Sequence, residues 1–263
     1  MTERTVVYAT QGGEPLPADV YLPEAQQPSP VIIAMHGGSW KRGVRASYKY
    51  LGPFFAAHGI ALMTIDYRLA TDVTNLYPAA VDDVRAAVRY VREHATELNI
   101  DPTRIVLMGD SAGGHLAALV GLTERPAVKA VIGVVGVYDL AAQWQHDLPA
   151  RPSDNIAQGF LGVPLPENRQ LYFEASPVSH ATTPNADGGP SFMVVWSLFD
   201  DIVDHVTQSE AFLRALKQAG FYARSLVQQT NHFWIGDPLD EPGSHSAYFA
   251  VRALRFLEDR FSR

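Results

Sequence analysis

Gly109-Asp110-Ser111-Ala112-Gly113 places one serine between two glycines, directly after one apolar stretch and directly before another. Residues 104–108 (RIVLM) predict a short buried strand, and residues 115–122 (HLAALVGL) predict a helix of small residues. The serine is therefore expected on a strained strand-to-helix turn that exposes its hydroxyl and aims the helix N-terminus at any anion formed there. Ordinary capped turns share the pattern, but the flanking strand and helix favour a nucleophile.

On both sides of this turn, apolar stretches alternate with amphipathic ones. The predicted helices besides 115–122 are residues 79–94, 206–219 and 244–261. This alternation predicts an α/β fold, a mostly parallel eight-stranded sheet with helices on both faces and an antiparallel hairpin of the first two strands at one edge. The predicted strands are 6–9, 18–22, 31–35, 61–65, 104–108, 128–135, 192–196 and 223–227.

The chain length of 263 residues is compatible with one α/β domain, and we expect a single domain over residues 1–263. One long interruption, at about 140–190, is rich in Pro, Gly and aromatic residues. Segments of this length in compact domains are usually functional, so we expect a small lid-like insertion there.

Composition excludes several classes of function. The 21 basic and 28 acidic residues give a net charge of -7 without a basic run, which argues against nucleic-acid and anionic-membrane partners. There is no cysteine, and hence no thiol nucleophile, disulfide framework or Cys-based metal site. The N-terminal sequence lacks a leader pattern, and a cytoplasmic location is expected. A homodimer remains open.

A serine nucleophile needs a base and a group that orients the base. His232 follows the strand 223–227, and Asp200 follows the strand 192–196, so both are expected at the carboxyl edge of the sheet with Ser111. Asp201 and Asp204 compete with Asp200 for the role of the acid, and His245, at the start of the last helix, competes with His232. The order Ser111, Asp200, His232 along the chain is typical of this fold.

Donors for a developing oxyanion are expected from a glycine loop. His36-Gly37-Gly38-Ser39-Trp40 follows the strand 31–35, where the N–H groups of Gly38 and Ser39 would join that of Ala112. A loop of this kind is often just a turn, but its position after this strand favours an oxyanion hole.

A metal site is an alternative for this part of the chain, because Asp200, Asp201, Asp204 and His205 cluster in the sequence. No HExxH pair or EF-hand spacing accompanies them, so we predict neither a metal nor another cofactor.

With these residues in hand, the chain resembles the α/β-hydrolase superfamily, and within it the carboxylesterases of the hormone-sensitive-lipase and bimodular feruloyl-esterase-like groups. The resemblance rests on HGGSW, DYRLA, YPAAVDDVRAAVRYV, GDSAGGHLAAL and SPVSH, which stand in the family's order. It implies a triad of Ser111, Asp200 and His232 and no cofactor. Arg68, within DYRLA, is interpreted as a buried ion-pair partner.

The predicted function is a serine carboxylesterase for small esters with short-chain or aromatic acyl groups. Compact aromatic walls are expected from Trp40, a candidate substrate-binding residue, and from Trp144, Phe160, Tyr172 and Phe173. Arylformamidase, which resembles this chain in HGGxW and SAGxH, or another small-amide hydrolase is the alternative enzyme. A binding protein on the same scaffold is the non-enzymatic alternative.

Overall fold

The computed structural model describes residues 1–124 and 127–262. Its centre is an eight-stranded sheet with the strand order β1-β2-β4-β3-β5-β6-β7-β8. The strands from β4 to β8 are parallel, whereas β1 and β2 form an antiparallel hairpin at one edge. The strands are β1 (Thr2–Gln11), β2 (Glu14–Leu22), β3 (Ser29–Met35), β4 (Ala61–Ile65), β5 (Ile100–Asp110), β6 (Ala130–Val134), β7 (Ser191–Ser197) and β8 (Ala223–Gln228).

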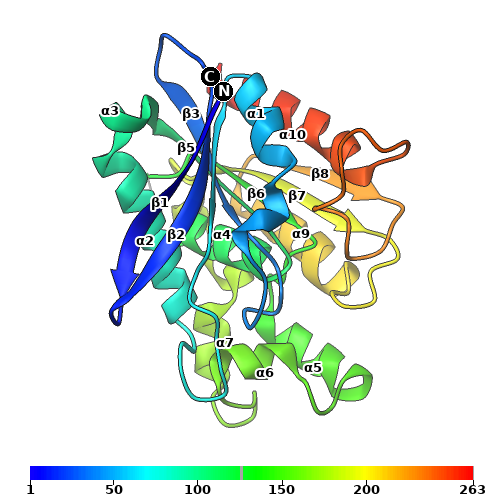
Figure 1. Cartoon of the computed structure of the whole chain (residues 1–263). Helices are drawn as coiled ribbons and strands as arrows, with labels where there is room; N and C mark the ends of the chain where they lie inside the picture. Colours follow the sequence, from blue (N-terminus) through cyan, green and yellow to red (C-terminus); the bar gives the residue numbers. More distant parts are fainter. Residues whose placement is uncertain (125–126, 263) are drawn as a thin grey trace.

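Helices cover both faces of this sheet (Figure 1). On one face pack α2 (Ala79–Glu93), α4 (Ala112–Thr123) and α9 (Ala211–Ala219). On the other face pack α1 (Leu51–Ala57) and α10 (His245–Phe261). The predicted fold class is therefore confirmed, and every predicted strand is present. The sequence reading missed α1, and its helix 206–219 begins with a π-helical turn, Val206–Glu210.

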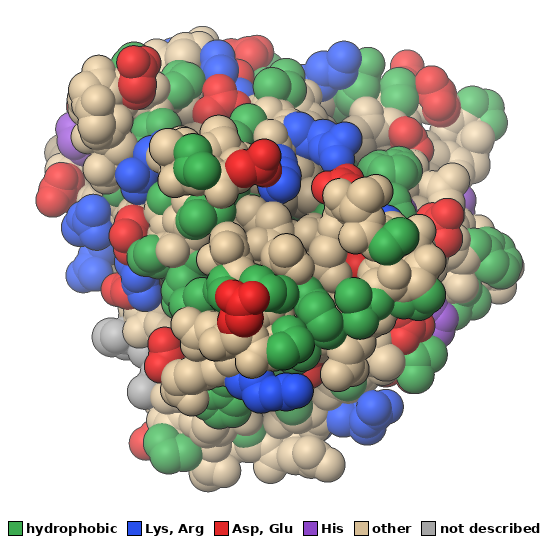
Figure 2. Space-filling model, turned by 90° about the horizontal axis from the view of Figure 1, so that it is seen from below, with side chains coloured by type: hydrophobic (Ala, Val, Ile, Leu, Met, Phe, Trp, Pro, Cys, Tyr) green, Lys and Arg blue, Asp and Glu red, His purple; other side chains and the backbone are tan. Residues whose placement is uncertain are grey.

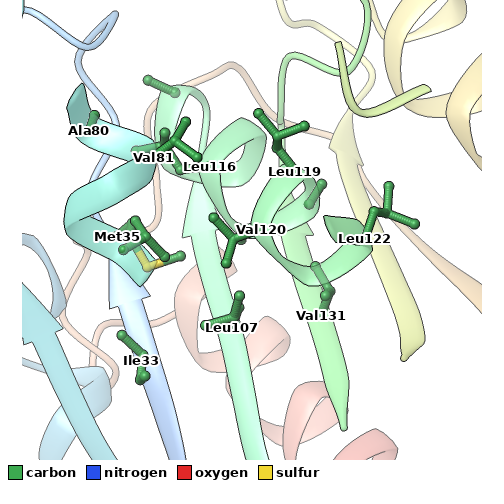
Figure 3. Close-up of a cluster of buried hydrophobic side chains, with 14 of the residues drawn as sticks. Ile33, Met35, Ala80, Val81, Leu107, Leu116, Leu119, Val120, Leu122 and Val131 are labelled. Atoms are coloured by element: carbon green, nitrogen blue, oxygen red, sulfur yellow. The ribbon is translucent and has the colours of Figure 1, made fainter. Parts of the chain in front are cut away.

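The continuous apolar strands follow from burial on both faces. All residues of β3, β4 and β6 are buried, so these strands lack the alternation of a sheet with one solvated face. Figure 3 shows side chains of β3, β5 and β6, such as Ile33, Leu107 and Val131, beneath Leu116 and Val120 of α4. The small residues of α4 allow the helix to lie close to the sheet, and this fixes the helix that follows Ser111.

The segment at about 140–190 is mostly helical rather than irregular. It contains α5 (Leu140–Ala150), α6 (Ile156–Leu161), α7 (Arg169–Ala175), a 3₁₀ turn (Pro177–His180) and α8 (Thr183–Ala186). Side-chain caps begin the first three of these helices, from Asp139, Asn155 and Asn168. In Figure 1, α5, α6 and α7 lie together at the bottom of the molecule, beyond the lower end of the sheet.

In the part of the chain that the structure describes, no helix has both the length and the apolar character needed to cross a membrane.

Candidate active site

Ser111 occupies the turn between β5 and α4 in a conformation that residues with a side chain rarely adopt. Its φ is 51° and its ψ is -115°, and its N–H donates to the carbonyl of Val134 at 2.8 Å. A Cβ on Gly113 would lie 1.9 Å from the carbonyl oxygen of Met35, so only glycine permits this approach of α4 to β3. The predicted strained turn is present, and it holds Ser111 at the carboxyl edge of the sheet.

His232 and Asp200 contact one another in the loops that follow β8 and β7. His232 Nδ1 lies 2.7 Å from Asp200 Oδ2, and the two side chains are only 4% and 1% exposed. The other oxygen, Asp200 Oδ1, accepts the N–H groups of Ile202 and Val203 at 3.0 and 2.9 Å. With an ionised Asp200, Nδ1 carries the ring proton, which leaves Nε2 of His232 free to accept one.

The competing acids and histidine are engaged elsewhere. Asp201 is exposed, and Asp204 accepts the hydroxyl of Thr207 at 2.7 Å as a local cap. His245 Nδ1 lies 2.8 Å from Gln228 Oε1. Among the residues weighed for these roles, the geometry therefore favours Asp200 and His232.

A cavity of about 260 Å³ connects the predicted residues. Ser111 and His232 line it together with Gly38 and Ser39, whereas Asp200 stands behind the histidine. The cavity is completed by side chains from the loop after β3, from the segment 151–156 and from the loops after β7 and β8. These residues are Arg42, Arg151, Asp154, Ile156, Ile202 and Phe233.

The predicted oxyanion donors lie in the glycine loop after β3 and at the start of α4. Gly38 and Ser39 have φ of 113° and 55°, and neither N–H makes a backbone–backbone hydrogen bond within the described residues. A Cβ on Gly38 would lie 2.1 Å from the carbonyl oxygen of Arg42, so this turn requires glycine. Ala112 begins α4, where the first N–H groups have no partner within the helix. The three N–H groups are thus available for an anion.

Two further residues, which the sequence reading missed, hold the loop that contains Gly38. Asp110 is half-buried and accepts hydrogen bonds from the hydroxyl of Tyr48 at 2.8 Å and from the N–H of Gly37. Burial raises the pKa of the Asp110 carboxyl, and its hydrogen bonds act in the opposite direction. Asp110 directly precedes Ser111 in the motif GDSAG, so its acidic side chain and its position could have indicated a supporting role in the site. Tyr48 could not be found from the sequence, because its hydrogen bond to Asp110 joins residues that are far apart in the chain.

The DYRLA stretch supports the same loop from another side. The hydroxyl of Tyr67 donates to the carbonyl of His36 at 2.8 Å, and the two rings stack. Arg68 forms the expected ion pair, with its Nη2 and Nε at 2.7 and 3.0 Å from Asp83 Oδ1, but its own side chain is half-buried rather than buried. Asp83 is fully buried in α2, so this stretch joins the site to the adjacent helix.

The prediction of aromatic cavity walls is wrong, because none of the five predicted aromatic side chains is among the residues that line the cavity. Trp40 is fully buried away from the cavity, where its indole N–H donates to His115 Nδ1 at 3.2 Å and its ring stacks on Phe160. Tyr172 is also fully buried, and Phe173 is exposed. The consecutive positive φ values of Ser39 and Trp40 turn the indole into the core. Phe233, with charged side chains, lines the cavity instead.

The acidic cluster after β7 separates in three dimensions. Asp200 bonds His232, Asp204 caps its own turn, and His205 Nδ1 lies 3.1 Å from Glu210. Across the described residues, no three side chains of the types His, Cys, Asp and Glu are grouped as metal ligands would be.

A parallel sheet with a serine elbow, an Asp–His pair and a glycine loop at its carboxyl edge defines the class of α/β-hydrolase proteins. The sequence model of the BD-FAE family matches residues 18–216, and the chain belongs to this family. The predicted resemblance is thereby confirmed.

Curated relatives carry esterase names. The chain is 31% identical over 208 residues to esterase LipC of Mycobacterium tuberculosis, covering 73% of this chain and 49% of that protein. It is 30% identical over 254 residues to a probable isoprenylcysteine alpha-carbonyl methylesterase of Oryza sativa subsp. japonica, covering 90% and 59%. The chain thus spans roughly half the length of such relatives.

Solved structures agree on the fold. Carboxyl esterase 2 of Tuber melanosporum is 28% identical with a TM-score of 0.79, and the alignment covers 98% of this chain and 85% of that one. Esterase 2 of Thermogutta terrifontis has a TM-score of 0.75 at 25% identity, with 98% and 91% covered.

Proposed function

We propose that the protein is a serine carboxylesterase in which Ser111, Asp200 and His232 form the catalytic triad. The observation that carries the proposal is the shared cavity of Ser111 and His232, with Asp200 Oδ2 on the Nδ1 side of the histidine ring. The esterase names of the curated relatives support ester hydrolysis over other reactions of this fold.

The mechanism follows from the positions of these groups. His232 Nε2 takes the proton of the Ser111 hydroxyl while Oγ attacks the ester carbonyl carbon. The N–H groups of Gly38, Ser39 and Ala112 stabilise the negative charge that forms on the carbonyl oxygen. The protonated His232 then gives its proton to the departing alkoxide, and an acyl-enzyme remains.

Water completes the cycle by the same route. His232 removes a proton from water, the hydroxide attacks the acyl carbonyl, and Ser111 leaves with the proton. Throughout, Asp200 holds the ring orientation and stabilises the imidazolium, and its own hydrogen bonds from Ile202 and Val203 hold the carboxylate in place. No cofactor is needed for these steps.

We further propose that residues 140–190 form a lid-like insertion in a single domain. Arg151, Asp154 and Ile156 come from this segment and line the cavity. A chain of contacts ties the segment to the Asp200 loop: Gln143 Nε2 donates to the carbonyl of Ile202 at 3.0 Å and to Asp147 Oδ1 at 2.9 Å. The small cavity suits a short-chain or compact aromatic ester.

The decisive experiment is covalent labelling. A fluorophosphonate should add once, and peptide mapping by mass spectrometry should place the label on Ser111. The Ser111→Ala variant should lose both the label and ester hydrolysis, and labelling that persists in this variant would contradict the assignment. N-formylkynurenine hydrolysis faster than that of every ester would favour arylformamidase instead.

A further inference from the structure

Arginine side chains stand unexpectedly in the wall of the cavity that contains Ser111. Arg42 and Arg151 both line it, and Asp154 is the one carboxylate among its lining residues. Each arginine has a carboxylate nearby, Asp154 beside Arg42 and Asp147 beside Arg151, and Asp147 does not itself line the cavity. Figure 2 looks onto this end of the molecule and shows basic side chains above and below a central band of apolar ones.

Arg151 is the better ordered of the two. It follows α5, and its Nε lies 3.3 Å from Asp147 Oδ1, while its side chain is only 22% exposed. Asp147 is itself fully buried and receives Gln143 Nε2 on Oδ1 and the N–H of Ile156 on Oδ2 at 2.9 Å each. The guanidinium is thus ion-paired on its Nε side with a buried carboxylate, which restricts the side chain before a ligand binds.

Arg42 belongs to the oxyanion loop itself. Its N–H donates to the carbonyl of Gly38 at 3.0 Å, and its carbonyl packs against Gly38. Its guanidinium lies 3.8 Å from Asp154, and both side chains are largely exposed. Such a solvated pair is weak, so Asp154 can part from Arg42 when a substrate anion enters.

We propose that Arg42 and Arg151 form an anion subsite and that the preferred substrates are esters carrying a carboxylate near the scissile bond. This rests on the proposed esterase function. A planar guanidinium binds a carboxylate through two parallel hydrogen bonds, and the partly enclosed position of Arg151 limits screening by solvent. The carboxylate sits on either the acyl or the alcohol part of the ester, and separate substrate pairs distinguish the two.

The test compares isosteric esters. On the acyl side, monoethyl adipate is paired with ethyl 6-methylheptanoate; on the alcohol side, 4-acetoxybenzoate is paired with 4-isopropylphenyl acetate. In one pair, kcat/KM for the anionic ester should exceed that for the neutral one by about tenfold at low salt, and added salt should reduce the preference. Equal values in both pairs would overturn the inference.

Variants identify the groups responsible. Arg151→Gln should bring the preference to about one, Arg151→Lys should keep part of it, and Arg42→Gln should reduce it less, because Arg42 is more exposed. Arg255→Gln, which removes the same charge far from the cavity, is the control. A preference that survives both Gln substitutions would also overturn the inference.

Two measurements distinguish failure of the anion subsite from failure of the proposed esterase function. Fluorophosphonate labelling of Ser111 should proceed at the wild-type rate within about twofold in the Arg255→Gln control, and covalent labelling of Ser111 in the Arg151 variants reports that they are folded with a reactive serine. If Arg151→Gln does not fold, Arg42→Gln and the salt dependence of the wild type decide. Ser111-dependent hydrolysis of neutral esters without an anion preference refutes the subsite alone, whereas the absence of all Ser111-dependent ester hydrolysis refutes the esterase function.

Discussion

His232 Nδ1 and Asp200 Oδ2 lie 2.7 Å apart although 32 residues separate them along the chain. The contact exists because β7 and β8 are parallel neighbours, which brings the loops after their carboxyl ends together. Both side chains are buried, and Asp200 is fixed further by two backbone N–H groups. The contact therefore fixes the orientation of the His232 ring.

Replacing Asp200 tests this contact directly. Asp200→Asn should lower kcat on a short ester by about 10³- to 10⁴-fold, because Asn can favour the wrong tautomer of His232 and cannot stabilise its cation. Asp201→Asn, a neighbouring and exposed acid, should change kcat by less than about twofold. A greater loss in Asp201→Asn than in Asp200→Asn would reverse the assignment.

The cavity volume predicts a limit on acyl length. Each buried methylene contributes about 0.8 kcal/mol only while the cavity has room, and the cavity measures about 260 Å³. Across p-nitrophenyl esters, kcat/KM should therefore peak between acetate and about hexanoate and fall steeply by decanoate. A steady rise to palmitate would indicate an extended groove.

Adding one methyl group at Gly113 should lower the free energy of unfolding strongly. The Cβ of Gly113→Ala would overlap the carbonyl of Met35, and both backbones are buried, so about 2 kcal/mol or more of the free energy of unfolding should be lost. The matched control is Gly159→Ala in α6, where the Cβ meets only the flexible end of Lys41. This control should be neutral or stabilising by up to about 1 kcal/mol, as measured by urea unfolding. Equal effects of the two substitutions would contradict the packing argument.

The buried His115 should make the free energy of unfolding of the protein depend on pH. Burial lowers its pKa from 6.5 to about 4, and neutral Nδ1 accepts the indole N–H of Trp40 while Nε2 donates to the carbonyl of Ala175 at 2.8 Å. Below pH 6.5 the unfolded chain binds a proton that the folded chain does not, so stability falls as pH drops from about 6.5 to 4, by about 3 kcal/mol in total.

Urea unfolding of the wild type and of His115→Gln between pH 7.5 and 4.5 checks this effect. The variant should start less stable at pH 7.5, because it disturbs a buried contact, but should lose less stability over this range since Gln does not titrate. Identical slopes in the two proteins would exclude His115 as the source.

Local sequence patterns were sufficient to predict the fold, and they also point to the residues proposed for the candidate site. Continuous apolar strands alternating with amphipathic helices specify a parallel sheet, and a parallel sheet brings the ends of its strands to one edge. The motif around Ser111 and the order of Ser111, Asp200 and His232 follow from local patterns of this kind. Gly109 and Gly113 allow the close backbone contacts around Ser111, and both glycines are part of the motif itself.

The side chains that face the cavity depend on long-range packing and could not be predicted from local patterns. Trp40 has the same apolar character whether it lines a pocket or packs on Phe160, and consecutive positive φ values turned it inward. From the sequence, Arg151 would be expected to be an ordinary solvent-exposed charge. Its position at the cavity depends on its ion pair with the buried Asp147. Side-chain direction in irregular segments depends on long-range packing and hydrogen bonding, which local periodicity does not encode.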